Sequence, residues 1–99
     1  MIKIYSMPSC PDCVHVEAQV KGNDQYQIVD IGSHVRVLKE FLRLRDSHPA
    51  FADARRFGQV GIPCFVLSDG TVTLTPEDVG LTSRPVADGE SCSLDGTGC

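Results

Sequence analysis

The sequence predicts one α/β domain in which a four-stranded mixed β-sheet is flanked by helices. Three observations support this prediction: strand-like runs alternate with segments of helical period, a proline opens the third apolar run, and an Asp-Gly turn follows it. Strands that alternate with helices tend to pair in parallel, whereas strands joined by a tight turn pair antiparallel. The 99 residues are enough for one such domain.

The first strand, the first helix and the second strand form a β-α-β unit. Residues 2–5 alternate apolar and other side chains, as a short strand does, and Pro8 ends the strand. A helix is predicted over residues 11–21, because apolar residues recur at helical spacing and Gly22 is a natural stop. Residues 26–31 then form the second strand.

A second helix follows the turn and N-cap offered by Gly32-Ser33, and it runs to about Asp46. Its predicted core-facing stripe consists of Val35, Leu38, Phe41 and Leu42. A further short helix is predicted over residues 49–57, and Gly58 ends it.

The third and fourth strands form a hairpin. Pro63 takes the first position of the third strand, which runs to Leu67, because a proline cannot donate a hydrogen bond inside a sheet. Asp69-Gly70 is a tight turn, and residues 71–74 return as the partner strand. Thr75 is then predicted to N-cap a last short helix.

The predicted domain comprises residues 1–81, and residues 82–99 are predicted to form a C-terminal tail. The tail contains glycines and two cysteines but few large apolar residues. We therefore expect it to be weakly ordered unless its cysteines tie it down.

Composition and charge exclude several classes of protein. The formal net charge is −4 and basic residues are scattered, so nucleic acid is not an expected partner. No long uncharged apolar run predicts a membrane span, and Lys3 interrupts any secretory apolar region, so we expect a cytoplasmic protein with no membrane partner. Five cysteines in such a chain indicate reduced thiols with a chemical role rather than a disulfide scaffold.

The segment Cys10-Pro11-Asp12-Cys13 predicts a redox-active dithiol at the start of the first helix. Pro11 suits the first helical position, where its fixed φ helps and its missing N–H costs nothing. At a helix N-terminus the free N–H groups and the macrodipole favour the thiolate of Cys10, the predicted catalytic nucleophile. Cys13, one turn inside the helix, is predicted to resolve the mixed disulfide.

Cysteines at this spacing also occur in zinc sites, which normally need four ligands. A second close pair is missing here, so no metal is expected at the dithiol. The alternative to an enzyme is a non-enzymatic redox or metal sensor in which Cys10, Cys13, Cys92 and Cys99 form a four-thiolate site. Cys92 and Cys99 are otherwise unpaired thiols or a tail disulfide that exchanges with the dithiol.

The motif Tyr-Ser-x-Pro-x-Cys-Pro-x-Cys precedes the first helix of glutaredoxins, and residues 5–13 match it. Gly61-Ile62-Pro63 matches the place of the family's cis-proline. Over residues 1–80 the chain resembles glutaredoxins of the thioredoxin-fold superfamily, which implies a thioredoxin-like sheet and thiol-disulfide exchange with disulfide substrates. The resemblance also implies that Pro11, Ile62 and Pro63 contact the substrate, with the Ile62 backbone hydrogen-bonding its chain.

Three positions differ from the glutaredoxin pattern. Met7 stands where many members have a lysine that holds a glutathione carboxylate, and residues 74–78 lack the family's two glycines. Arg55 and Arg56 are the alternative cations for such a carboxylate, although a surface position is the simpler expectation. No bound cofactor is expected, and the external reductant is either glutathione or a thioredoxin-reductase-type protein.

The third difference is Asp12, which stands where an aromatic residue is common. Its carboxylate should oppose ionisation of Cys10. Asp12 and His15 are expected to be solvated on the first helical turn, with a role as proton acceptor for Cys13 as the alternative. Cys64 follows Pro63 directly, and it is either a small buried hydrophobe or an auxiliary thiol near the site.

Overall fold

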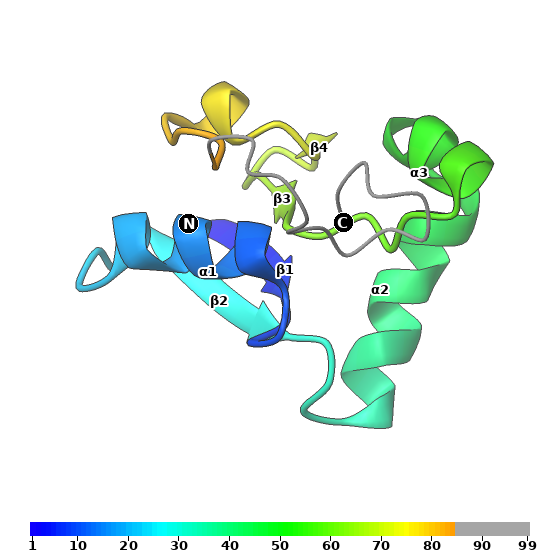
Figure 1. Cartoon of the computed structure of the whole chain (residues 1–99), viewed down its shortest axis with the longest axis horizontal. Helices are drawn as coiled ribbons and strands as arrows, with labels where there is room; N and C mark the ends of the chain where they lie inside the picture. Colours follow the sequence, from blue (N-terminus) through cyan, green and yellow to red (C-terminus); the bar gives the residue numbers. More distant parts are fainter. Residues whose placement is uncertain (85–99) are drawn as a thin grey trace.

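The computed structural model describes residues 1–84, and it has a four-stranded mixed β-sheet with the βαβ start typical of a thioredoxin-like fold (Figure 1). The elements in chain order, with η for a 3-10 helix, are β1 (Ile2–Ser6), α1 (Pro11–Val20), β2 (Tyr26–Asp30), α2 (Val35–Ser47), η1 (Pro49–Phe51), α3 (Ala52–Phe57), β3 (Cys64–Val66), β4 (Val72–Thr73) and η2 (Pro76–Val79). The predicted fold class is therefore confirmed. Within the described part of the chain, every helix is too short or too polar to traverse a lipid bilayer.

The strands lie in the order β2-β1-β3-β4, so β1 is central. Ile4 pairs in parallel with Ile28 of β2 and antiparallel with Phe65 of β3. Because β3 runs antiparallel to β1, its first residue, Cys64, pairs with Tyr5 near the end of β1. The loop that leaves β1 and the segment that enters β3 therefore meet at one edge of the sheet.

Successive side chains of a strand point to opposite faces, and each face of this sheet has its own apolar cluster. One cluster, covered by α1 and η2, contains Ile4, Val16, Val20, Phe65, Val79 and Leu81. The other lies against α2, η1 and α3 and contains Tyr5, Cys10, Cys13, Ile31, Phe41, Phe51, Ala54, Ile62 and Cys64. The N-terminus of α1 thus brings both of its cysteines into the second cluster.

The core-facing stripe predicted for α2 is wrong except at Phe41, which is fully buried. Val37 and Leu44 pack against the same cluster as Phe41, and their spacing of four and three residues is also helical. The other predicted members, Val35, Leu38 and Leu42, are exposed. Two apolar stripes fit the sequence of α2, and contact with the sheet selects the one that sequence periodicity did not favour.

The N-cap of α2 is His34 rather than the predicted Gly32-Ser33. The backbone N–H of Arg36 donates to His34 Nδ1 at 3.0 Å, which satisfies one of the unpaired N–H groups of the first turn. Ser33 instead closes the preceding turn, where its hydroxyl donates to the carbonyl of Asp30 at 2.7 Å. An imidazole can therefore serve as a capping acceptor where sequence rules look for a hydroxyl or carboxylate.

We expect His34→Ala to lower the free energy of unfolding by about 0.5–2 kcal/mol, because the alanine cannot accept the Arg36 N–H. His34→Asn should keep most of that stability, since an amide oxygen is also a good capping acceptor. Urea unfolding measures both. The control is Arg36→Ala, which keeps the capped backbone N–H. Equal stability of His34→Ala and the natural protein would show that water replaces the imidazole at no cost.

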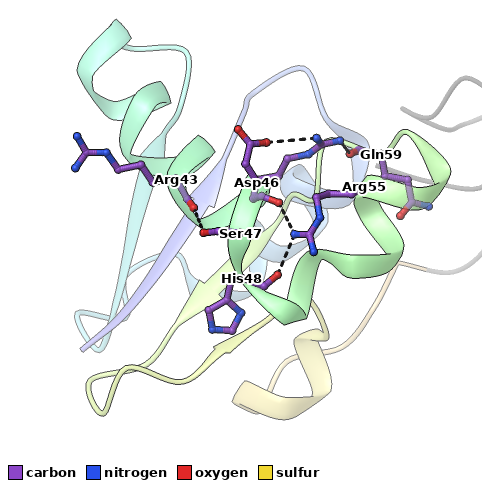
Figure 2. Close-up of polar contacts among 7 residues, drawn as sticks. Arg43, Asp46, Ser47, His48, Arg55 and Gln59 are labelled. Atoms are coloured by element: carbon purple, nitrogen blue, oxygen red, sulfur yellow. Dashed lines mark hydrogen bonds and ion pairs between the residues drawn. The ribbon is translucent and has the colours of Figure 1, made fainter.

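The junction between α2 and α3 is held by arginine side chains (Figure 2). Arg55 Nη1 donates to the carbonyls of Arg45 and His48, at 2.8 and 3.0 Å. Arg45 Nη2 in turn donates to the carbonyl of Gln59 at 2.6 Å. Arg55 therefore satisfies backbone carbonyls at the C-terminal end of α2 and ties α3 to it. The bond from Arg45 to Gln59 holds the segment that leads from α3 to β3.

The predicted hairpin is present, although β4 is shorter than expected. The Asp69-Gly70 turn is closed by the N–H of Gly70 donating to the carbonyl of Leu67 at 3.0 Å. Thr75 precedes η2 but does not cap it through its side chain, contrary to the prediction. Its own N–H donates to Thr73 Oγ1 at 3.1 Å.

Candidate active site

Cys10 lies immediately before α1, in the loop that leaves the central strand β1. Its N–H donates to the carbonyl of Met7 at 3.2 Å, and its own carbonyl accepts the N–H of Val14 at 3.0 Å. Cys10 is thus the N-cap residue, with Pro11 at the first helical position as the sequence predicts. Because Pro11 has no N–H, the first helical donors close to the cysteine belong to Asp12 and the residue after it.

The environment of Cys10 favours its thiolate. The thiol of Cys13 donates a hydrogen bond to the Cys10 sulfur, and this is the largest cause that lowers the pKa of Cys10 from 9.0 to about 7. The backbone N–H groups of Cys13 and Asp12 lower this pKa further, whereas burial and the Asp12 carboxylate oppose the change. The N-terminus of α1 therefore stabilises negative charge at Cys10.

Cys13 has the opposite tendency. Its role as hydrogen-bond donor to Cys10, its burial and the nearby carboxylate of Glu17 all raise its pKa. Glu17 lies one turn further along α1, and its carboxylate accepts a hydrogen bond from the buried Ser6 hydroxyl at 2.9 Å. One thiol of the pair is thus prepared to be a thiolate and the other to remain protonated.

The peptide bond between Ile62 and Pro63 is cis, and it leads directly into β3. Ile62 and Cys64 belong to the same buried cluster as Cys10 and Cys13. The structure therefore brings the cysteine pair and the proline segment together across the edge of the sheet. No other cis peptide bond occurs in residues 1–84.

Cys64 is the third thiol of this cluster. It is fully buried, and burial raises its pKa to about 12. A protonated thiol is a poor nucleophile, so the burial and raised pKa of Cys64 favour the expected packing role over an auxiliary role in exchange.

Asp12 is not solvated as predicted, because it forms an ion pair with Arg84. Arg84 Nε lies 2.8 Å from Asp12 Oδ1, and the two side chains are only 15% and 29% exposed. No motif or spacing in the sequence connects these two residues, which lie far apart in the chain. Arg84 is therefore a site residue that sequence reasoning missed.

His15 also differs from its predicted solvated position. Its Nε2 atom is buried and has no hydrogen-bond partner among the residues that the structure describes. The side chain lies one turn beyond Asp12 on α1. A buried imidazole nitrogen in this place shows that α1 is covered on the side that carries Asp12.

No group of three or more histidine, cysteine, aspartate or glutamate side chains in residues 1–84 is placed to hold a metal ion. Within these residues, no disulfide joins Cys10, Cys13 and Cys64 to one another. Cys92 and Cys99 lie outside the described residues, as does most of the predicted tail. The four-thiolate alternative is therefore untested by the structure.

The fold and site define a thioredoxin-like α/β protein with a Cys-x-x-Cys pair at a helix N-terminus. Comparison with known proteins finds a relative from Haemophilus influenzae (strain ATCC 51907 / DSM 11121 / KW20 / Rd), whose name is "Uncharacterized protein". It is 36% identical over 73 residues, which span 72% of this chain and 84% of the relative. The chain belongs to the same family as this protein. No family model and no solved structure matches the chain.

Proposed function

We propose that the protein is a glutaredoxin-like thiol-disulfide oxidoreductase. The observation that carries this proposal is the opposite effect of the site on its two thiols: the pKa of Cys10 is lowered to about 7, and that of Cys13 is raised. A nucleophile that ionises near neutral pH, beside a thiol that stays protonated, is the arrangement that stepwise disulfide exchange needs.

In the first step, the Cys10 thiolate attacks one sulfur of a substrate disulfide. A Cys10–substrate disulfide forms, the substrate S–S bond breaks, and the other substrate sulfur leaves as a thiolate. The negative charge that raised the pKa of Cys13 is then gone from Cys10, so Cys13 can lose its proton to the departing thiolate. Cys13 then attacks Cys10, which releases the second substrate thiol and leaves a Cys10–Cys13 disulfide.

The substrate chain is proposed to lie along the segment that enters β3. The Ile62–Pro63 segment precedes β3 and shares the apolar cluster of the dithiol, so the backbone of Ile62 is the candidate partner for a substrate chain. Pro11 would contact the substrate from the other side, since it directly follows Cys10 and is partly exposed.

Two thiols of an external reductant must return the two electrons to the Cys10–Cys13 disulfide. We propose glutathione or a thioredoxin-reductase-type protein for this role. Arg55, the cation suggested for a glutathione carboxylate, instead donates to backbone carbonyls between α2 and α3. Turnover of a small disulfide with glutathione, compared with turnover with thioredoxin reductase and NADPH, distinguishes the two donors.

We expect Cys13→Ser to accumulate a mixed disulfide at Cys10, because the thiolate can still attack but no thiol remains to resolve the product. Cys10→Ser should form no adduct, since its remaining site thiol is buried and protonated. Mass spectrometry of the intact protein and its peptides after incubation with a small disulfide measures both results.

Cys64→Ser is the matched control, because it removes a thiol of the same cluster without removing either member of the dithiol. It should turn over like the natural protein if it folds. An adduct on Cys10→Ser but not on Cys13→Ser would reverse the assigned roles, and no adduct on either would refute the proposed function.

A further inference from the structure

Residues 82–84, here called the strap, are bonded to the body of the domain at every position. The Thr82 N–H donates to Gln19 Oε1 at 2.8 Å, and Gln19 Nε2 donates to the Thr82 carbonyl at 2.9 Å. The Ser83 N–H and hydroxyl donate to the two carboxylate oxygens of Glu77 at 2.7 and 2.8 Å. Arg84 ends the strap at Asp12, with Nε 2.8 Å from Oδ1.

The strap follows one face of α1. Asp12, His15 and Gln19 are separated by three and four residues, so they lie above one another on the helix. Thr82 binds the far end of this row and Arg84 binds the end beside the dithiol. The strap thus crosses the stretch of α1 that contains His15, whose Nε2 is buried without a partner.

We propose that the strap is a device that holds Arg84 against Asp12, so that the guanidinium offsets the only carboxylate inside the Cys-x-x-Cys loop and keeps Cys10 reactive. Arg84 is in this view a positioning residue that acts on Cys10 through Asp12. The proposal rests on the proposed function for its biological meaning, although its electrostatic content does not depend on turnover.

The charges around Cys10 support this role of Arg84. Within residues 1–84, the groups that act on the Cys10 sulfur include the Cys13 thiol, the N–H groups of Asp12 and Cys13 and the Asp12 carboxylate, and the carboxylate opposes the thiolate. Cys64 lies in the same cluster as a protonated thiol, and Glu17 acts on Cys13. A carboxylate bonded to a guanidinium presents a dipole rather than a net charge, so its repulsion of a nearby thiolate falls. Low exposure of both partners limits screening by solvent.

The test is the pH dependence of iodoacetamide labelling at Cys10, resolved by mass spectrometry of peptides from the full chain. Arg84→Gln removes the positive charge, so the pKa of Cys10 should rise by about 0.5–1. Arg84→Lys keeps a cation and should restore most of the difference. Gln19→Ala leaves every charge in place but removes the anchor of Thr82, so it should raise the pKa in the same direction by a smaller amount.

Arg43→Gln is the matched control, because it makes the same charge change on the exposed side of α2 and should leave the labelling midpoint unchanged. In an Asp12→Asn background, Arg84→Gln should shift the pKa of Cys10 by less than half of its effect in the natural protein. An equal effect in both backgrounds, or no effect of Arg84→Gln in a folded protein, would overturn the proposal. If Arg84→Gln does not fold, Gln19→Ala provides the test. An unchanged labelling midpoint of Cys10 in Gln19→Ala would refute the role of the strap.

Labelling at Cys10 does not require disulfide turnover. Failure of this proposal is therefore separable from failure of the proposed function, which the trapping experiment on Cys13→Ser tests. Both proposals are supported if Arg84→Gln raises the pKa of Cys10 and the mixed disulfide still forms in this variant, but more slowly at pH 7.

Discussion

Replacing Gly61 with alanine should lower the free energy of unfolding by about 2–5 kcal/mol, a large part of the roughly 5–15 kcal/mol that a domain of this size has. Gly61 has φ +93°, a conformation that costs a side-chain-bearing residue about 1–3 kcal/mol. A methyl group at this position would lie 2.7 Å from Cδ1 and Cε1 of Phe51, so the buried ring must move. Overpacking of this kind adds about 1–3 kcal/mol.

Gly58→Ala is the control for Gly61→Ala, and urea unfolding measures both. Gly58 also has a positive φ, +70°, but a methyl group there would meet no atom within 4 Å. The difference between the two variants therefore isolates the clash with Phe51. Because Gly61 directly precedes Ile62 and Pro63, we also expect disulfide turnover to fall more in Gly61→Ala than stability alone explains. Equal losses of stability in both variants would show that the Phe51 ring moves aside freely.

The reaction of Cys10 with a small disulfide should rise with pH through a midpoint near 7 and level off above it. The rate rises with pH because the thiolate is the reactive form. The midpoint lies near 7 because the pKa of Cys10 is lowered from 9.0 to about 7. At pH 7 about half of Cys10 is thiolate, against about 1% of an ordinary thiol. Nucleophilicity falls as the pKa falls, so the Cys10 thiolate is about tenfold less nucleophilic than the thiolate of an ordinary cysteine. The net gain in the reaction rate of Cys10 at pH 7 is therefore about fivefold.

The first exchange step on reduced protein, followed by stopped-flow mixing and mass spectrometry, gives the midpoint. Cys10 is only 3% exposed, so burial limits the absolute rate, and the midpoint is the quantity to compare. Cys64 is the internal control: with a pKa of about 12 it should remain unmodified across the same range. A midpoint near 9 for Cys10 would mean that the helix N-terminus and Cys13 do not stabilise its thiolate.

Local patterns were sufficient to predict most of the fold. The strand-loop-helix start, the helix stop near Gly22 and the Asp-Gly hairpin each depend on residues close in sequence, and the structure has all three. The apolar stripe of α2 was predicted wrongly because periodicity finds two overlapping faces, and only packing against the sheet selects Phe41 and its neighbours. The capping role of His34 was missed because few histidines cap helices and sequence rules favour Ser33.

The cysteine pair and the opposing effect of Asp12 on Cys10 were predicted from the sequence, but the contributions of Glu17 and Arg84 were not. Glu17 reaches the site because Ser6 holds its carboxylate, and Arg84 reaches Asp12 because the strap returns along α1. Both contacts depend on how separate segments meet in three dimensions, and neither residue belongs to a recognisable motif. The sequence could therefore predict the thiol pair that we propose to react, whereas the contacts of Glu17 and Arg84 required the structure.

The central place of β1 in the order β2-β1-β3-β4 has a consequence for the folding of this chain. One of the two partners of Ile4 is Phe65, and α1, β2, α2 and α3 all lie between the two residues in the chain. Until β3 pairs with β1, one edge of β1 is open, and the cluster that buries Cys10 and Cys13 lacks Ile62 and Cys64. A partly folded chain therefore exposes both thiols, and pairing of β3 with β1 buries them.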